Sequence, residues 1–141
     1  MNQYIKDVLI KNGWDAKSYS YMKSEYKTRI LKAYSKYTYE MTDEILEYLA
    51  LFYNIKIRCQ SNNLIICFNI KKSNRYRQMA LDWQAEKFGV HQVIHIADLN
   101  PGYENLWMDE SGGIWGDFEQ YINFYGKNLC LAVETISKKL S

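Results

Sequence analysis

The apolar pattern of this chain changes period at Asn54, and this change constrains the fold more than any other feature. Before this residue, apolar side chains recur every three or four positions, as they do on one face of a helix. After it, over residues 55–60, apolar side chains alternate with charged or amide side chains, which is typical of a half-buried strand. Helical and strand-like segments are therefore segregated along the chain, and this favours an α+β fold with an antiparallel sheet.

Helices are expected over residues 2–12, 22–36 and 42–54. Gly13 is a natural stop for the first helix, and Asp43 and Glu44 suit the first turn of the third helix. Ser73 is expected to cap a fourth helix that closes at Gly89. A last amphipathic helix is expected over residues 129–140.

Strands are expected over residues 55–60 and 64–70, which form a hairpin, and over 93–98, 106–109 and 114–118. Turns rich in Asn, Pro, Ser and Gly separate the last three, at residues 100–102 and 111–113. The order ααα-ββ-α-βββ-α predicts an antiparallel sheet of about five to six strands packed against helices, in a single domain over residues 1–141.

Composition excludes several classes of protein. The chain of 141 residues has ordinary fractions of apolar (48%) and charged (24%) residues, so disorder is not expected. The three cysteines form no CxxC pair and are expected to be reduced core thiols. No secretory leader and no long apolar run is present, which predicts a cytoplasmic protein with no membrane contact. No cofactor is implied.

Catalytic and metal-binding motifs are absent from the sequence: it has no phosphate-binding Gly-rich loop, no GxSxG and no HExxH. His91 and His95 are four residues apart, but a strand would separate their rings by roughly 13 Å, so no metal site is expected. An enzyme with an unrecognised Cys/His site, such as Cys67 with His95, is kept as an alternative, because such pairs are assembled in space.

The position of charge is more informative than its total. The net charge is only +2, yet residues 1–75 carry 13 basic and 7 acidic side chains, whereas residues 98–119 carry six acids and no base. Tyr103, Trp107 and Trp115 are interleaved with those acids. Aromatic rings beside carboxylates suit a surface that receives a basic protein partner.

The basic, tyrosine-rich N-terminal half permits a second alternative, a module that binds single-stranded nucleic acid by stacking and phosphate neutralisation. Against it, most lysines fall on the polar sides of the predicted helices and most tyrosines on the apolar sides. Direct nucleic-acid binding is therefore not expected.

Several motifs resemble the SUKH superfamily of bacterial immunity proteins, in particular its third immunity subgroup. Residues 8–14, Val-Leu-Ile-Lys-Asn-Gly-Trp, resemble the helix followed by Gly-Trp that opens those proteins. Residues 106–115, Leu-Trp-Met-Asp-Glu-Ser-Gly-Gly-Ile-Trp, resemble their strand, acidic turn with glycine, and aromatic strand. Gly126 and the final amphipathic helix match the end of the family pattern. The sequence departs from this pattern in lacking an Arg soon after Gly-Trp.

The resemblance implies a protein that is not an enzyme and that binds a cognate toxin domain, often a nuclease, and blocks its active surface. Many nucleases are basic, so the acidic segment could steer the association. The residues expected to contact the toxin are Tyr103, Glu104, Trp107, Asp109, Glu110, Asp117 and Glu119. The sequence leaves the activity of the toxin and the oligomeric state of the chain open.

Overall fold

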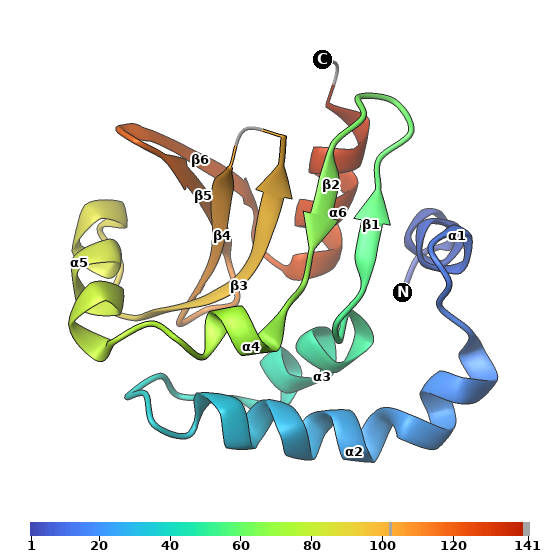
Figure 1. Ribbon diagram of the computed structural model, residues 1–141, viewed down its shortest axis with the longest axis horizontal. Helices are drawn as coiled ribbons and strands as arrows, with labels where there is room; N and C mark the ends of the chain where they lie inside the picture. Colours follow the sequence, from blue (N-terminus) through green and yellow to red (C-terminus); the bar gives the residue numbers. More distant parts are fainter. Residues whose placement is uncertain (102, 140–141) are drawn as a thin grey trace.

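The computed structural model describes residues 1–101 and 103–139 and contains one six-stranded antiparallel sheet in the order β1-β2-β3-β4-β5-β6 (Figure 1). Each strand pairs with the strands next to it in sequence. The strands are β1 (Lys56–Arg58), β2 (Ile65–Cys67), β3 (Val93–Asn100), β4 (Glu104–Asp109), β5 (Ile114–Phe118) and β6 (Tyr121–Gly126). The α+β class and the antiparallel sheet predicted from the sequence are confirmed.

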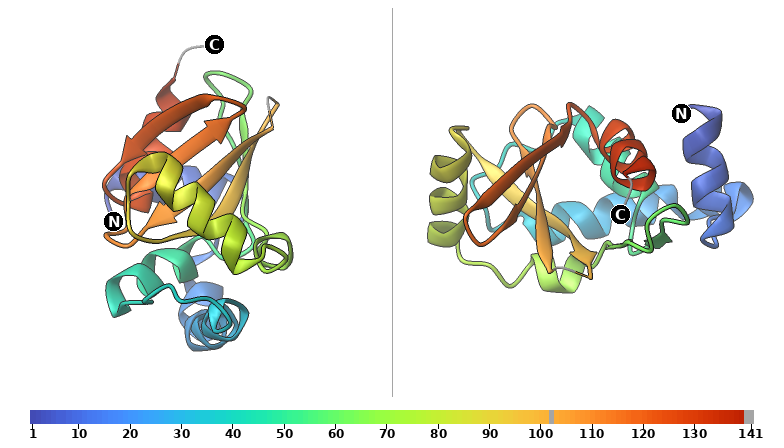
Figure 2. Two further views of the ribbon diagram at one scale, coloured as in Figure 1. Left: turned by 90° about the vertical axis from the view of Figure 1, so that its left-hand side faces the viewer. Right: turned by 90° about the horizontal axis from the view of Figure 1, so that it is seen from above.

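Helices cover both sides of the sheet. They are α1 (Gln3–Lys11), α2 (Ala16–Tyr34), α3 (Asp43–Leu51), α4 (Ile70–Ser73), α5 (Gln78–Phe88) and α6 (Leu129–Lys138). Figure 2 places α5 and α6 on opposite sides of the strands, and α2 and α3 lie beneath the sheet in the orientation of Figure 1. Because both faces are covered, both Trp107 and its neighbour Met108 on β4 are buried.

Side-chain caps explain where most helices begin, because an oxygen at the N-cap satisfies a backbone N–H that the helix leaves unpaired. The capping side chains are Asn2, Asp15, Thr42, Asn69 and Asn128. The cap at Asp15 starts α2 at Ala16, six residues earlier than the apolar pattern predicts. Gly13, at φ +94°, follows the end of α1 and confirms the predicted helix stop.

Ser73 does not cap the fourth helix, and that prediction is wrong. It is the last residue of the short helix α4, and it is buried with its hydroxyl against the ring of His95. The helix that contains Met79 and Trp83 begins after Arg77, without a side-chain cap, and ends at Gly89 as predicted. The polar partner of Ser73 lies 22 residues away, so local sequence carries no signal for it.

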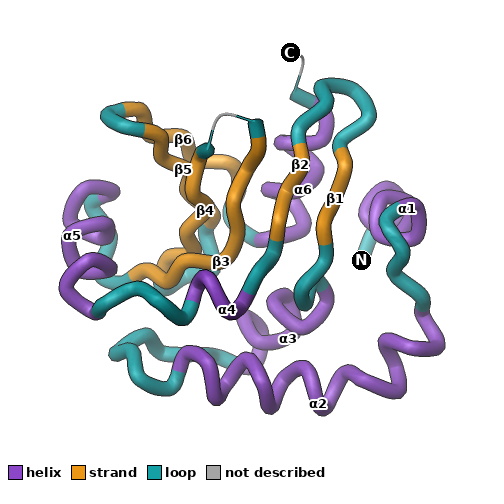
Figure 3. The backbone as a smooth tube through the Cα atoms, in the orientation of Figure 1, coloured by secondary structure: helices purple, strands orange, loops and turns teal. Residues whose placement is uncertain are grey.

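The sixth strand, β6, is a further difference from the residue-by-residue prediction (Figure 3). Four of its six side chains are exposed, and its apolar residues Tyr121, Ile122, Phe124 and Tyr125 do not keep the strict alternation of a half-buried strand. Two predicted residues, Gly102 of a turn and Leu140 of the last helix, lie outside the described residues. No described helix is both long and apolar enough to cross a membrane.

Candidate functional site

One end of the sheet brings together four of the seven residues predicted to contact a partner. Tyr103 and Glu104 lie where β4 begins, and Asp117 and Glu119 lie where β5 ends. The two groups are neighbours because Asn105 on β4 pairs with Asp117 on β5. We call this group of Tyr103, Glu104, Asp117 and Glu119 the open end of the sheet. The tip of the β5–β6 hairpin lies above α5 in the orientation of Figure 1.

Tyr103 and Glu119 are the residues at the open end most available to a partner. The Tyr103 side chain is 78% exposed, and Glu119 is exposed in the turn between β5 and β6. Both have left-handed backbones, at φ +58° and +55°, in which residues with a Cβ are strained by roughly 1 kcal/mol. Such strain in exposed turns is found disproportionately at sites that bind.

Glu104 and Asp117 are held in place by neighbouring side chains. The Tyr125 hydroxyl donates to the two oxygens of Glu104 at 2.8 and 2.7 Å. Burial, and then the carboxylate of Glu104, raise the pKa of Tyr125 well above its ordinary value. Asp117 accepts from the indole Nε1 of Trp107 at 2.7 Å and from Lys87 Nζ at 3.1 Å. Both carboxylates are thus oriented by the fold, and Lys87 partly neutralises Asp117.

Trp107 lies inside the molecule, only 3% exposed. Its ring packs edge-on against Tyr76 and His95, with centroids 5.2 Å away in both cases. The structure thus gives this residue a role in the core and corrects its assignment as an aromatic anchor for a partner. Sequence reasoning placed it on the surface because its neighbours in the segment are acidic.

Asp109 and Glu110 lie at the opposite end of β4, in the β4–β5 turn. Asp109 is 7% exposed, and its carboxylate accepts from the backbone N–H of Ser111 and Gly113 and from Trp115 Nε1 at 2.8–2.9 Å. We call this turn, residues 109–113, the closed end. A buried carboxylate that accepts three hydrogen bonds organises the turn and is not presented to a partner.

The Glu110 side chain also forms its hydrogen bonds within the protein. Its carboxylate accepts from the backbone N–H of His91 at 3.1 Å and of Gln92 at 3.4 Å. Burial alone would raise the pKa of Glu110, but hydrogen bonds from backbone N–H groups outweigh it and hold the pKa below its usual value. This carboxylate therefore stays ionised while it fixes the chain just before β3.

A buried polar chain around His95 is the main feature that sequence reasoning missed. Ser73 Oγ lies 2.8 Å from His95 Nδ1, and His95 Nε2 lies 3.1 Å from Asp98 Oδ1 and 3.3 Å from Asn105 Oδ1. Burial alone would raise the pKa of Asp98, but hydrogen bonds from His95 and Lys72 outweigh it and lower the pKa. The spacing of His95 and Asp98, three apart on a bulged strand, is the one local signal for this pair.

The predicted alternative of a Cys67–His95 nucleophile gains no hydrogen bond in the described residues. Both ring nitrogens of His95 already have partners, and the ring is 1% exposed. The sulfur of Cys67 instead accepts weakly from Asn100 Nδ2 at 3.8 Å. No described group of three or more His, Cys, Asp and Glu side chains could hold a metal ion.

Part of the basic, tyrosine-rich N-terminal half makes contacts within the molecule. Lys23 and Lys27 on α2 both pair with Glu47 on α3. The rings of Tyr26 and Tyr53 stack on each other at 4.3 Å between centroids, rather than standing free for a nucleotide base.

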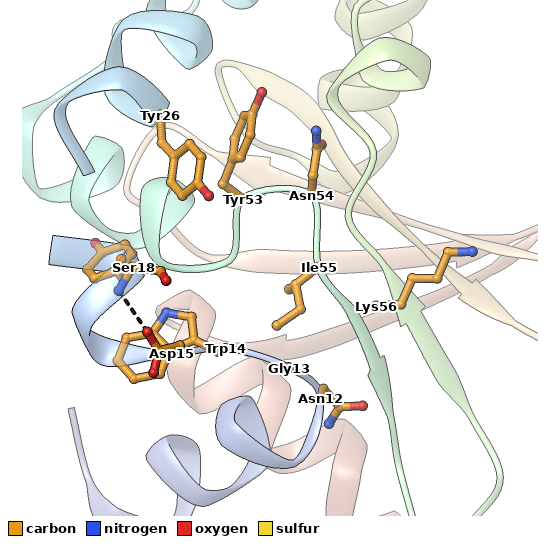
Figure 4. A pocket seen from close by; sticks show the side chains of 11 residues that line it. Asn12, Gly13, Trp14, Asp15, Ser18, Tyr26, Tyr53, Asn54, Ile55 and Lys56 are labelled. Atoms are coloured by element: carbon orange, nitrogen blue, oxygen red, sulfur yellow. Dashed lines mark hydrogen bonds between the residues drawn. The ribbon is translucent and has the colours of Figure 1, made fainter. Parts of the chain in front are cut away.

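A cavity of about 370 Å³ lies between the end of α1, the start of α2 and the segment after α3 (Figure 4). Tyr26, Tyr53 and Trp14 contribute aromatic walls, and Asp15 and Lys56 contribute charges of opposite sign. The indole Nε1 of Trp14 is buried and has no hydrogen-bond partner among the described residues. Trp14 also packs against the core while it lines this cavity.

Comparisons with protein-family models, with curated proteins and with solved structures find no match for this chain.

Proposed function

We propose that this chain is a protein-binding module without catalytic activity, which acts in the bacterial cytoplasm as an immunity protein and blocks a basic toxin domain, such as a nuclease. The observation that carries the proposal is the open end of the sheet. There, exposed Tyr103 and Glu119 occupy two strained turns beside the oriented carboxylates of Glu104 and Asp117.

These side chains suit a basic protein partner for two reasons. A tyrosine ring buries a large area at a small cost in conformational entropy, and tyrosine is enriched among residues that dominate binding energy. Carboxylates around such an anchor raise the rate of association with a basic surface and suppress wrong partners. The resemblance of residues 8–14 and 106–115 to SUKH immunity proteins supports the same proposal, and it supplies the toxin as the class of partner.

The test is a binding measurement with a toxin domain that a neighbouring gene encodes; a neighbourhood without such a gene would count against the proposal. We expect Tyr103→Ala to weaken binding about 30-fold, as the loss of a central aromatic anchor does. Glu119→Gln is expected to slow association about threefold at low salt and to have less effect at high salt.

Glu110→Gln is the matched control for Glu119→Gln, since it removes the same charge at the closed end of the sheet. Its effect on association is expected to be small, because the Glu110 carboxylate is engaged with the backbone of His91 and Gln92. Equal effects of the two amide variants, or full toxin affinity in Tyr103→Ala, would contradict the assignment of the open end.

A further inference from the structure

The last strand of the sheet, β6, has an edge that no described part of the chain pairs with. Its six residues include no charged residue and no proline, and Tyr121, Ile122, Asn123 and Phe124 are all exposed. Natural proteins usually protect such an edge with charges, proline, a short strand or a covering element. An unprotected edge of this length is a template for another strand.

Hydrogen-bonded and non-hydrogen-bonded residue pairs alternate along the β5–β6 ladder, and this alternation shows which backbone groups of β6 point away from the sheet. Phe118 and Tyr121 close the β5–β6 hairpin, and Gly116 pairs with Asn123. In a tight hairpin the closing pair exchanges hydrogen bonds, and every second pair after it does the same. Tyr121 and Asn123 therefore direct their backbone groups toward β5, whereas Ile122 and Phe124 direct their N–H and C=O groups outward.

We propose that β6 is a dimer interface, at which β6 of a second copy of this chain pairs in antiparallel orientation about a two-fold axis at Asn123. In this register Ile122 lies opposite Phe124 of the second copy, and Phe124 lies opposite its Ile122. Each of these pairs exchanges two N–H···O bonds, because both members point outward. The two sheets then form one continuous sheet across the axis.

Charge favours a second copy as the occupant. Glu119 lies just before β6 and Lys127 lies just after it, and both side chains are exposed. An antiparallel two-fold pairing brings the start of one strand to the end of the other. It therefore brings Glu119 of each copy near Lys127 of the other, at both ends of the ladder.

Side-chain packing at the interface fits the same arrangement. Ile122 and Phe124 lie on one face of β6, and the ring of Phe124 already packs against Trp115, with centroids 4.9 Å apart. Trp115 in turn stacks on Phe88 of α5 at 5.2 Å. Pairing Ile122 with the second copy's Phe124 would extend this aromatic row across the axis and cover apolar surface that is now exposed.

The opposite edge of the sheet, strand β1, is poorly suited to pair with β6 of another copy. The assembly is therefore limited to two copies. β1 has only three residues, two of which are the exposed Lys56 and Arg58. Its outward backbone N–H at Arg58 already donates to the side-chain Oδ1 of Asn12 at 2.9 Å. Head-to-tail addition of β6 to β1, which would build a filament, is therefore disfavoured.

Sedimentation equilibrium of the full chain at increasing concentration tests the dimer. Ile122→Pro removes an N–H that points outward and leaves the β5 ladder intact, so it should weaken dimerisation at least tenfold without loss of the circular-dichroism spectrum. Lys127→Glu should weaken it about threefold, and adding Glu119→Lys should restore it. Lys71→Glu, which makes the same charge change on α4, should have no effect.

A disulfide tests the register. In a chain with Cys67→Ser and Cys130→Ser, Asn123→Cys should cross-link with itself, because residues on the two-fold axis lie about 4.5–5.5 Å apart between Cα atoms. Ser111→Cys, in the exposed turn at the far end of β4, is the control and should not cross-link.

A chain that stays monomeric up to about 1 mM overturns the proposal. So does a dimer that is insensitive to Ile122→Pro, or one in which Asn123→Cys does not cross-link. The inference does not rest on the proposed function. Because Glu119 belongs to both the open end and the dimer interface, Ile122→Pro decides the dimer and Tyr103→Ala decides the toxin site, and each of these residues belongs to one surface only.

Discussion

The two ends of β4 carry similar residues and use them in opposite ways. At the closed end, the Asp109 carboxylate accepts three hydrogen bonds from its own turn and is buried. At the open end, Tyr103 and Glu119 extend from strained turns into solvent. The comparison teaches that an acidic, aromatic segment is not one surface: the closed end supplies stability, and the open end is free to bind. Three variants test this difference, and a measurement at alkaline pH tests a tyrosine that packs against Trp107.

Asp109→Ala is expected to have the largest effect, a loss of about 3–5 kcal/mol in the free energy of unfolding. The change leaves the N–H groups of Ser111, Gly113 and Trp115 without their acceptor, and a buried unpaired donor costs roughly 1–3 kcal/mol. Urea denaturation measures it. Glu119→Ala, at the open end, is the control and should stay within about 0.5 kcal/mol of the parent. Similar losses in both variants would remove the distinction between the ends.

Gly116→Ala is expected to cost about 1–3 kcal/mol, because it forces a methyl group into an occupied space. A Cβ at Gly116 would lie 2.1 Å from Glu104 Oε1 and 2.6 Å from Cε2 of the buried Tyr125 ring. The variant should also displace the Glu104 carboxylate and weaken toxin binding. Adding Glu104→Ala relieves the closer contact, so the double variant should recover part of the stability lost. No recovery would show that the Tyr125 ring sets the cost.

Alkaline pH should destabilise the protein through its buried and half-buried tyrosines. Burial, and then nearby carboxylates, raise the pKa of Tyr76 to about 12, above its value of 10 in the unfolded chain. A group whose pKa is raised by folding contributes stability below its unfolded pKa and loses it as pH rises toward the folded value. The unfolding free energy should therefore fall between pH 10 and 12, and Tyr76→Phe should reduce this slope. Urea titrations across that range, with absorbance at 295 nm, measure both.

Glu119→Gly is expected to have the smallest effect on stability, a gain of about 0.5–1 kcal/mol. Glycine adopts the left-handed conformation found at this position, φ +55°, without the steric penalty of a Cβ. The same variant should slow toxin association, since the charge is removed. Thermal unfolding and binding kinetics check the two effects. A destabilised variant would show that the Glu119 side chain supports the turn rather than facing a partner.

The architecture of the molecule could be predicted because it follows from periodicity. The change of period at Asn54 gave the α+β class, and Gly13 and Gly89 marked helix ends where the structure has them. β6 was missed because a strand at an open edge needs no buried face. Its residues Tyr121–Gly126 are mostly apolar but do not alternate strictly with polar ones.

The candidate site was less predictable, because its contacts join distant residues. Glu104 is oriented by Tyr125 and Asp109 by Trp115, while Ser73 and Asp98 flank the buried ring of His95. Composition located the acidic segment correctly. It could not tell which carboxylates form hydrogen bonds within the protein and which stay exposed to a partner. The antiparallel pairing of β4 with β5 brings Glu104 and Asp117 together at the open end and places Asp109 and Glu110 at the closed end.

The succession of strands in sequence order has a consequence for how the chain becomes a folded protein. Hairpins between sequence neighbours can form as soon as each is synthesised, since little loop entropy opposes them. The last helix is different. Asn62, in the β1–β2 turn, donates to the carbonyl oxygens of Ile136 and Lys139 at the end of α6, and Lys138 of this helix lies 4.6 Å above the ring of Tyr4 in α1. The surfaces of α1 and of the β1–β2 hairpin are therefore covered only after α6 has formed. A nascent chain on the ribosome cannot complete its fold until α6 has emerged.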